Sequence, residues 1–337
     1  MAQNTAASVR QRLLNKSREE KRRFDELLQY YAMERFLYRL SQSPHNRCFT
    51  LKGALMFWAM QGPNSRPTRD IDMSGQTSND PEAILAQVGE IIATEVPDDG
   101  LRFDPDTLKA ETITEDADYQ GLRVTFSGFL DNARIPMQLD IGFGDPIFPF
   151  PSWLEFPGLL DFPTARIKCY TPESSIAEKF QAMVNLGELN SRMKDFYDIW
   201  LLSRQHEFRL ENLEGAVEGT FRKRGTAIPE TSPFSAAFMD SKQPQWRAFR
   251  KRLGQEHVPE AFSEVVEAVV EFLGPLMLSR DVDAPKEIWC PPVHGVGRLM
   301  ASLISEDSIK QELLQRLQHI YGSNGLDRHT EKLENLT

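Results

Sequence analysis

The sequence predicts an α+β fold in which a β-sheet core with flanking helices is followed by a helical C-terminal half. Short apolar runs of strand length or strand alternation are confined to about residues 49–170. Over 8–41 and from Pro172 onward, apolar residues instead recur every three or four positions, which is the period of helices that bury one face. The two halves of the chain therefore differ in secondary structure.

The domain boundaries follow this change. We expect residues 1–170 to form a domain of N-terminal helices and sheet core, and residues 171–321 to form a helical domain. Residues 322–337 are polar, and we expect a flexible tail there. A chain of 337 residues suits two domains of roughly 150 residues each.

The composition excludes several classes of protein. Hydrophobic residues make up 40% and charged residues 26% of the chain, as in ordinary globular proteins, so a disordered or fibrous chain is not expected. The longest apolar run, 54–60, is far shorter than the roughly 20 residues that cross a bilayer. The polar N-terminus has no apolar stretch of the kind a secretory signal needs. We therefore expect a cytoplasmic protein without membrane contact.

Cysteine and histidine are too scattered for a zinc site or a disulfide framework. The three cysteines, Cys48, Cys169 and Cys290, are far apart and never paired in a short motif. The six histidines show no spacing typical of metal ligands. Metal chemistry would therefore have to use carboxylates.

The net charge of −10 is unevenly distributed. Residues 70–162 contain nineteen acidic side chains and only four basic ones, Arg102, Lys109, Arg123 and Arg134. We interpret the acids at 98–118 as solvated loop surface. The basic stretches 10–23 and 222–224 could contact an RNA backbone or could be solvated helix faces.

The first elements are helices and a strand–turn–helix unit. Apolar residues at helical spacing predict one or two helices over 8–41. Residues 49–51, Phe-Thr-Leu, lead through Lys52-Gly53 into the apolar run 54–60. This pattern predicts a short strand, a glycine turn and a buried helix.

Another strand, a helix and a hairpin follow. Residues 69–73 alternate polar and apolar, which is the period of a half-buried strand, whereas 81–95 has helical period. Two strand-like runs, 122–129 and 135–141, are joined by a short polar turn, which is typical of a β-hairpin.

The remaining elements are mostly helical. Residues 146–163, rich in proline and aromatic residues, are expected to be ordered but irregular, and 166–170 to be one more short strand. Helical periodicity predicts helices at 174–189, 192–205, 210–222, 243–253, 259–273 and 306–321.

Three acids stand among apolar strand residues: Asp70, Asp72 and Asp140. Residues two apart in a strand point to the same face, so Asp70 and Asp72 would lie side by side and repel unless a cation separates them. A neighbouring strand could add Asp140, and three acids would hold one or two Mg²⁺ ions suited to displacement at phosphorus. An Asp-x-Asp pair alone also fits surface acids, turn caps or a sugar-nucleotide glycosyltransferase.

The glycine at position 53 favours phosphate chemistry. The backbone N–H groups at the start of a helix bind phosphate, and Gly53 stands where the buried helix would begin. A glycine turn followed by an Asp-x-Asp strand therefore indicates a site for a phosphate together with a metal.

The helical half holds a second group of charges, Lys179, Arg192, Lys194, Asp195 and Asp198. Lys194 and Asp198 are four residues apart and could merely form a surface ion pair. Their neighbours within 193–202 are strongly apolar, however, which indicates a largely buried helix whose charges face a cleft.

Five segments in this order resemble one known family: LKGALMFW, RPTRDIDM, MQLDIGFGD, AEKFQAMVNLG and NSRMKDFYDIW. They are similar to the AbiEii/AbiGii nucleotidyltransferase toxins of bacterial abortive-infection and toxin–antitoxin systems, within the DNA polymerase beta-like nucleotidyltransferase superfamily. The resemblance covers about residues 8–275. It implies a nucleotidyltransferase-type mixed β-sheet core, a helical half, and a nucleoside triphosphate (NTP) in the cleft between them.

The resemblance also implies roles for single residues. Asp70, Asp72 and Asp140 would hold Mg²⁺ or Mn²⁺, and Asp140 could accept the proton of the attacking hydroxyl. Lys179 would contact the triphosphate, and Asp198, with Asp195 as the neighbouring candidate, would be a late acid of the cleft. The nucleotide-binding residues implied are Lys52, Gly53, Ala54, Arg66, Arg69, Lys179, Lys194 and Asp195.

The sequence departs from the superfamily pattern at Ala54, where glycine or serine is usual. The gap from Ala54 to Asp70 is also slightly long. Arg66 and Arg69 are nearby cations that could compensate, or could pair with the acidic strand.

The function implied is that of a Mg²⁺-dependent nucleotidyltransferase toxin. It would move a nucleoside monophosphate from an NTP to an acceptor hydroxyl, with the 3′ end of tRNA as the leading acceptor. The alternatives are transfer to a protein or to a small molecule such as an aminoglycoside, and nucleotide binding without catalysis. A separately encoded antitoxin is the expected protein partner.

Overall fold

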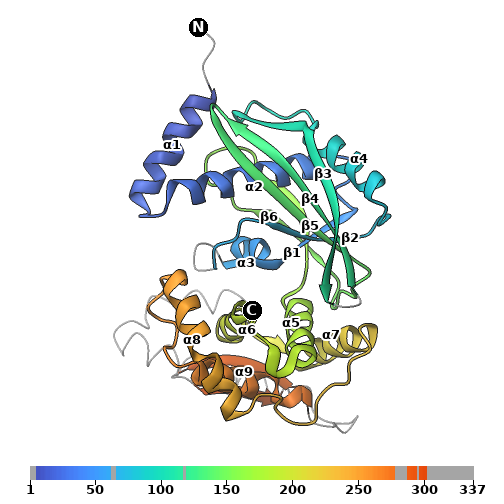
Figure 1. Ribbon diagram of the computed structural model, residues 1–337, viewed down its shortest axis with the longest axis vertical. Coiled ribbons are helices and arrows are strands. Elements are labelled where there is room, and N and C mark those ends of the chain that lie inside the picture. Colours follow the sequence, from blue (N-terminus) through green and yellow to red (C-terminus); the bar gives the residue numbers. More distant parts are fainter. Residues whose placement is uncertain (1–4, 62–65, 117–118, 278–286, 294–295, 302–337) are drawn as a thin grey trace, which may run out of the picture.

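The computed structural model describes residues 5–61, 66–116, 119–277, 287–293 and 296–301. Its core is a seven-stranded mixed sheet with the strand order β3-β4-β5-β2-β1-β7-β6. Helices α5 to α9 lie together below this sheet (Figure 1). The predicted α+β class, with a mixed sheet and a largely helical second half, is confirmed.

The centre of the sheet is the predicted strand–turn–helix unit. It consists of β1 (Phe49–Lys52), α3 (Gly53–Gln61) and β2 (Ile71–Gly75). β1 and β2 are antiparallel to each other, β1 is parallel to β7, and β2 is parallel to β5. The four residues of β1 are all buried, including the polar Thr50 and Lys52, because this strand lies in the interior of the sheet.

Three antiparallel strands form one edge of the sheet: β3 (Leu101–Asp116), β4 (Tyr119–Leu130) and β5 (Ala133–Phe143). The β4–β5 hairpin is confirmed. β3 corrects the interpretation of 98–118 as loop, because Leu101 and Phe103 alternate with polar residues and pack into the core. The high density of acids had concealed this strand.

The opposite edge consists of β7 (Ala165–Cys169) and the antiparallel β6 (Ser152–Phe156). The prediction that 146–163 is irregular is therefore wrong for β6. This edge strand has only one neighbour, and only Phe156 of its residues is buried. A strand that buries so little leaves almost no apolar alternation in the sequence.

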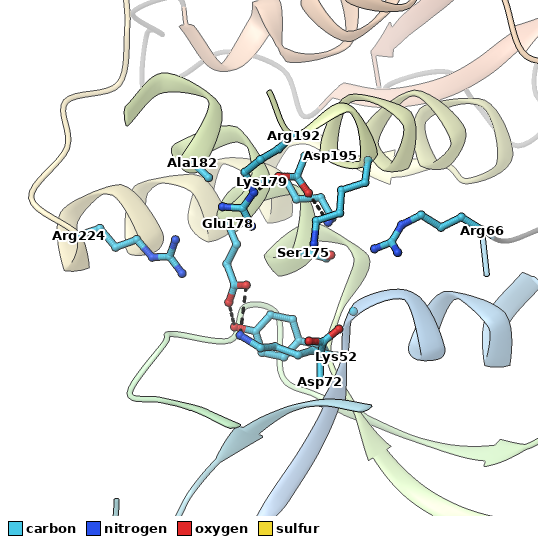
Figure 2. Close-up of a pocket in the computed structure, with 13 residues that line it drawn as sticks. Lys52, Arg66, Asp72, Ser175, Glu178, Lys179, Ala182, Arg192, Asp195 and Arg224 are labelled. Carbon is cyan, nitrogen blue, oxygen red and sulfur yellow. Dashed lines mark hydrogen bonds and ion pairs between the residues drawn. The ribbon is translucent and has the colours of Figure 1, made fainter. Parts of the chain in front are cut away.

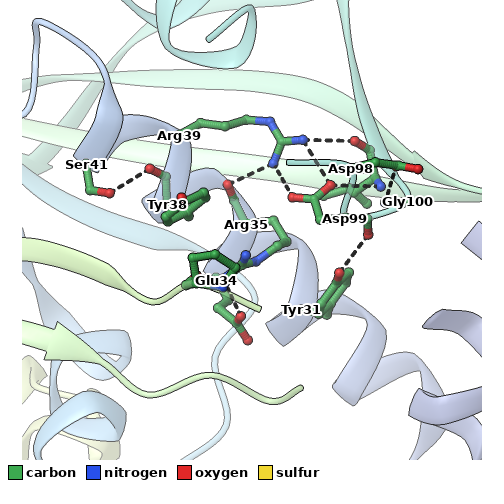
Figure 3. Close-up of polar contacts among 11 residues, drawn as sticks. Tyr31, Glu34, Arg35, Tyr38, Arg39, Ser41, Asp98, Asp99 and Gly100 are labelled. Carbon is green, nitrogen blue, oxygen red and sulfur yellow. Dashed lines mark hydrogen bonds and ion pairs between the residues drawn. The ribbon is translucent and has the colours of Figure 1, made fainter. Parts of the chain in front are cut away.

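Helix α2 (Phe24–Gln42) packs against β5 and β7, and contacts α1 (Thr5–Glu19) and α4 (Pro81–Ile92) (Figure 1). All its residues from 27 to 40 are buried, so its charged side chains need partners within the protein. Arg39 donates to both carboxylate oxygens of Asp99, at 2.8 and 3.1 Å (Figure 3). The expectation that Asp99 is a solvated loop acid is therefore wrong.

The second half contains five α-helices among its described residues. They are α5 (Pro172–Leu186), α6 (Met193–Gln205), α7 (Leu210–Lys223), α8 (Ala236–Leu253) and α9 (Phe262–Met277), with a short 3₁₀ turn at Gly187–Leu189. Phe196 of α6 packs against Phe238 of α8 and Phe262 of α9, which joins three helices around one aromatic cluster.

Strands are not confined to 49–170, contrary to the prediction. A small antiparallel sheet joins β8 (Phe208–Arg209), β9 (Glu287–Val293) and β10 (Val296–Ala301). The predicted helix at 306–321 and the predicted tail at 322–337 lie outside the described residues. Within the described part, the three cysteines are free and no helix is long and apolar enough to span a membrane.

Candidate active site

A row of charged side chains crosses one face of the sheet. Lys52 on β1 stands opposite Asp72 on β2, and Asp72 stands beside Asp140 on β5. Asp140 in turn stands opposite Arg123 on β4. Neighbours in register point to the same side of a sheet, so pairing of the strands alone brings these four side chains together.

Asp70, Asp72 and Asp140 converge, as the sequence predicted. One carboxylate oxygen of each lies within 4.8 Å of the other two. Burial and the nearby Asp70 raise the pKa of Asp72 to about 7, even though the cations Lys52, Lys194 and Arg66 oppose this rise. Three converging carboxylates are a donor set that fits a hard divalent cation.

Three neighbours orient the acids. Arg123 donates from Nε and Nη2 to the two carboxylate oxygens of Asp140, at 2.8 Å each, and Gln138 Nε2 adds a bond of 3.0 Å. The Thr68 hydroxyl donates to Asp70. Each carboxylate oxygen has more than one lone pair, so these bonds leave room for a metal. Arg123 was not predicted, although its rarity in such an acidic segment was a usable signal.

Only glycine fits at position 53. Its φ is +72°, and a Cβ atom there would lie only 2.0 Å from Oδ2 of Asp72. Helix α3 therefore begins directly against the acids, with the free N–H groups of its first turn at the site. Ala54 is fully buried, so its side chain lies in the core rather than in the site.

Charged residues of α5 and α6, together with Arg66, face the acids from the other side of the pocket (Figure 2). Lys179 Nζ lies 3.1 Å from Asp195 Oδ1 and 2.9 Å from Asp198 Oδ2. Arg66 Nε lies 3.0 Å from Asp198 Oδ1. The possible surface pair of Lys194 with Asp198 is wrong, because Asp198 is buried and pairs with Lys179 and Arg66.

The two acids of α6 keep these cations charged. Burial by itself lowers the pKa of Lys179, but the adjacent Asp195 and Asp198 outweigh it and raise the pKa overall. Arg192 Nε lies 2.9 Å from Asp195 Oδ2 and completes the pairing of that acid. Asp195 and Asp198 thus hold Lys179, Arg66 and Arg192 in place at the pocket.

The pocket between these walls is lined by Lys52, Gly53, Arg66, Asp72, Tyr170, Ser175, Glu178, Lys179, Ala182, Arg192, Lys194, Asp195 and Arg224. Arg69 is not among them. Its side chain is 80% exposed and lies 3.6 Å from Asp25 of α2. Arg69 therefore pairs with Asp25 rather than with an acid of the pocket.

Glu178 lines the pocket and was not predicted from the sequence. It lies 3.6 Å from Lys52 and accepts a hydrogen bond from the Tyr170 hydroxyl. Its position beside Lys179 was the signal available.

A comparison with known protein families decides the identity of the chain. Residues 35–268 match the family described as "Nucleotidyl transferase AbiEii toxin, Type IV TA system", and this match covers well over half of the sequence. The chain belongs to the AbiEii toxin family. It is therefore a nucleotidyltransferase of a type IV toxin–antitoxin family, which implies an NTP as substrate, a divalent metal as cofactor and an antitoxin as partner.

Solved structures add a distant likeness. A "putative nucleotidyltransferase from H. pylori" has a TM-score of 0.44 and 14% identity, covering 75% of this chain and 94% of that one. JHP933 from Helicobacter pylori has a TM-score of 0.42 and 14% identity, covering 72% and 88%. No curated protein matches the chain.

Proposed function

We propose that this AbiEii-family chain transfers a nucleoside monophosphate from an NTP to the 3′-terminal hydroxyl of tRNA, with Mg²⁺ as cofactor and release of pyrophosphate. The observation that carries the proposal is the convergence of Asp70, Asp72 and Asp140 beside a pocket with cationic walls. A carboxylate site next to phosphate-binding groups is the setting in which Mg²⁺ is usually bound. A tRNA acceptor would place the reaction in the cytoplasm.

Asp70, Asp72 and Asp140 are the residues that would hold the metal. Bound Mg²⁺ would neutralise charge on the phosphates. Thr68 and Arg123 keep the carboxylates of Asp70 and Asp140 in fixed orientations. In this proposal Asp140 accepts the proton of the attacking hydroxyl.

The triphosphate would lie against the start of α3. The N–H groups after Gly53 and the cations Lys52, Lys179 and Arg66 provide positive potential from several sides. Lys194 is exposed at the mouth of the same pocket. Asp195 and Asp198 act as positioning residues, because they hold Lys179 and Arg66 in place.

The nucleoside would extend into an adjoining groove. This groove has a volume of about 570 Å³ and shares Arg66, Arg192 and Lys194 with the triphosphate pocket. Phe249 and Gln245 also line it, and offer a ring for stacking and an amide for hydrogen bonding to a base. The NTP would thus lie between the proposed domains, residues 1–170 and 171–321.

The test is a transfer assay with α-labelled ATP, GTP, CTP or UTP, Mg²⁺ and purified tRNA. We expect label to enter tRNA from at least one NTP, and to be lost in the Asp70→Ala and Asp72→Ala variants, which should still fold. Label that enters protein or an aminoglycoside instead would overturn the tRNA assignment. Full activity in either variant would overturn the metal assignment.

A further inference from the structure

A separate groove lies on the sheet beside the three acids. Its volume is about 600 Å³, and side chains of β3, β4 and β5 line it together with Gln29 of α2 and Arg69. Gln138 also lines this groove and donates a hydrogen bond to Asp140. The groove therefore adjoins the acids, but it shares no lining residue with the nucleotide pocket.

The groove is basic within an acidic part of the chain. Arg69, Lys109 and Arg134 line it against one acid, Asp106. Lys109 and Arg134 are two of only four basic residues in 70–162. Both are exposed, and among the described residues no carboxylate lies within 4.0 Å of either. This local excess of positive charge suits a polyanion.

The position of the groove fits the geometry of phosphoryl transfer. The attacking hydroxyl and the leaving pyrophosphate lie roughly in line, on opposite sides of the α-phosphate. The proposed triphosphate pocket uses Lys52 on β1 and the start of α3. The groove lies in the other direction from the acids, over β5, β4 and β3, because the strand order runs β3-β4-β5-β2-β1.

We propose that this groove binds the acceptor, a polyanionic strand whose terminal hydroxyl reaches Asp140, and that Arg69, Lys109 and Arg134 contact its phosphates. The inference rests on the proposed function and extends it to the binding site for RNA. An aminoglycoside is a polycation and would be repelled by these three residues.

The test is the double variant Lys109→Gln/Arg134→Gln. The matched control is Arg47→Gln/Arg166→Gln, which removes two exposed cations outside the groove. Transfer of label to purified tRNA is measured against tRNA concentration at several salt concentrations, together with the KM for the NTP. We expect the KM for tRNA to rise about tenfold and the slope of its logarithmic salt dependence to fall by about 2. The KM for the NTP should stay within about twofold, and the control should match wild type.

Three results would overturn the inference. If wild type labels tRNA but the groove variant keeps the wild-type KM for tRNA and the wild-type salt dependence, the groove is not the tRNA site and the proposed function stands. If the variant loses NTP affinity instead, the two cations belong to the nucleotide site. If wild type transfers no label to tRNA while still binding NTP, the proposed function and the groove fail together.

Discussion

Replacing Asp72 by Asn should stabilise the metal-free protein at pH 8 while abolishing transfer. Burial and Asp70 raise the pKa of Asp72 from 3.8 to about 7. The folded protein therefore holds this proton more tightly than the unfolded chain, so stability falls as pH rises from about 4 to about 7 and stays lower above that range. A rise of about three pKa units corresponds to at most about 4 kcal/mol. Because the side chain keeps some contact with solvent, we expect about 2 kcal/mol.

Urea unfolding in EDTA at pH 8 and at pH 4 measures this difference. The Asn variant should have the larger free energy of unfolding at pH 8, and the two proteins should agree more closely at pH 4. Saturating Mg²⁺ should stabilise wild type and leave the variant unchanged, because only wild type binds the ion tightly. The exposed Asp240→Asn should change stability by less than about 0.5 kcal/mol. A variant that is less stable than wild type at pH 8 would refute the argument, since Asp72 would then be satisfied by its cations.

Three further predictions follow from other contacts. Gly53→Ala places a Cβ against Asp72 Oδ2, so kcat/KM for transfer should fall at least about 100-fold. Near-normal transfer would contradict this expectation, because it would show that α3 can move away from Asp72. Lys179→Gln removes one cation from the buried Asp195 and Asp198, so the free energy of unfolding in urea should fall by about 3 kcal/mol. Nucleotide titration should also show a weaker NTP affinity. An unchanged affinity would contradict contact between Lys179 and the phosphates. Arg39→Met leaves the buried Asp99 without its cation and should lower the free energy of unfolding in urea by about 3–5 kcal/mol. The double variant Arg39→Met/Asp99→Leu should recover most of that loss. The NTP affinity of the folded protein should not change in either variant.

Local sequence patterns were sufficient for some of the candidate site. The two-residue period of a strand placed Asp70 and Asp72 on one face, and the structure has them close together. The glycine before an apolar run located the turn at Gly53. The apolar neighbours of Asp195 and Asp198 correctly indicated that these acids are buried.

Other parts of the fold were concealed by the local pattern. The acids of β3 masked its apolar alternation, and the exposed edge strand β6 had almost none. Buried ion pairs were concealed for another reason, since neither Arg39 nor Asp99 reveals in the sequence that the other will neutralise it.

The sequence by itself determined the class of fold, the pair Asp70 and Asp72, and membership of the toxin family, because short-range periodicity and ordered motifs carry that information. Tertiary structure decided the strand register that sets Asp140 directly beside Asp72, and it alone decided that Arg123 holds Asp140 and that Arg66 reaches across to Asp198. The physical reason is that strand pairing and ion pairing join residues far apart in the chain, and their register depends on how the whole sheet and the helices pack.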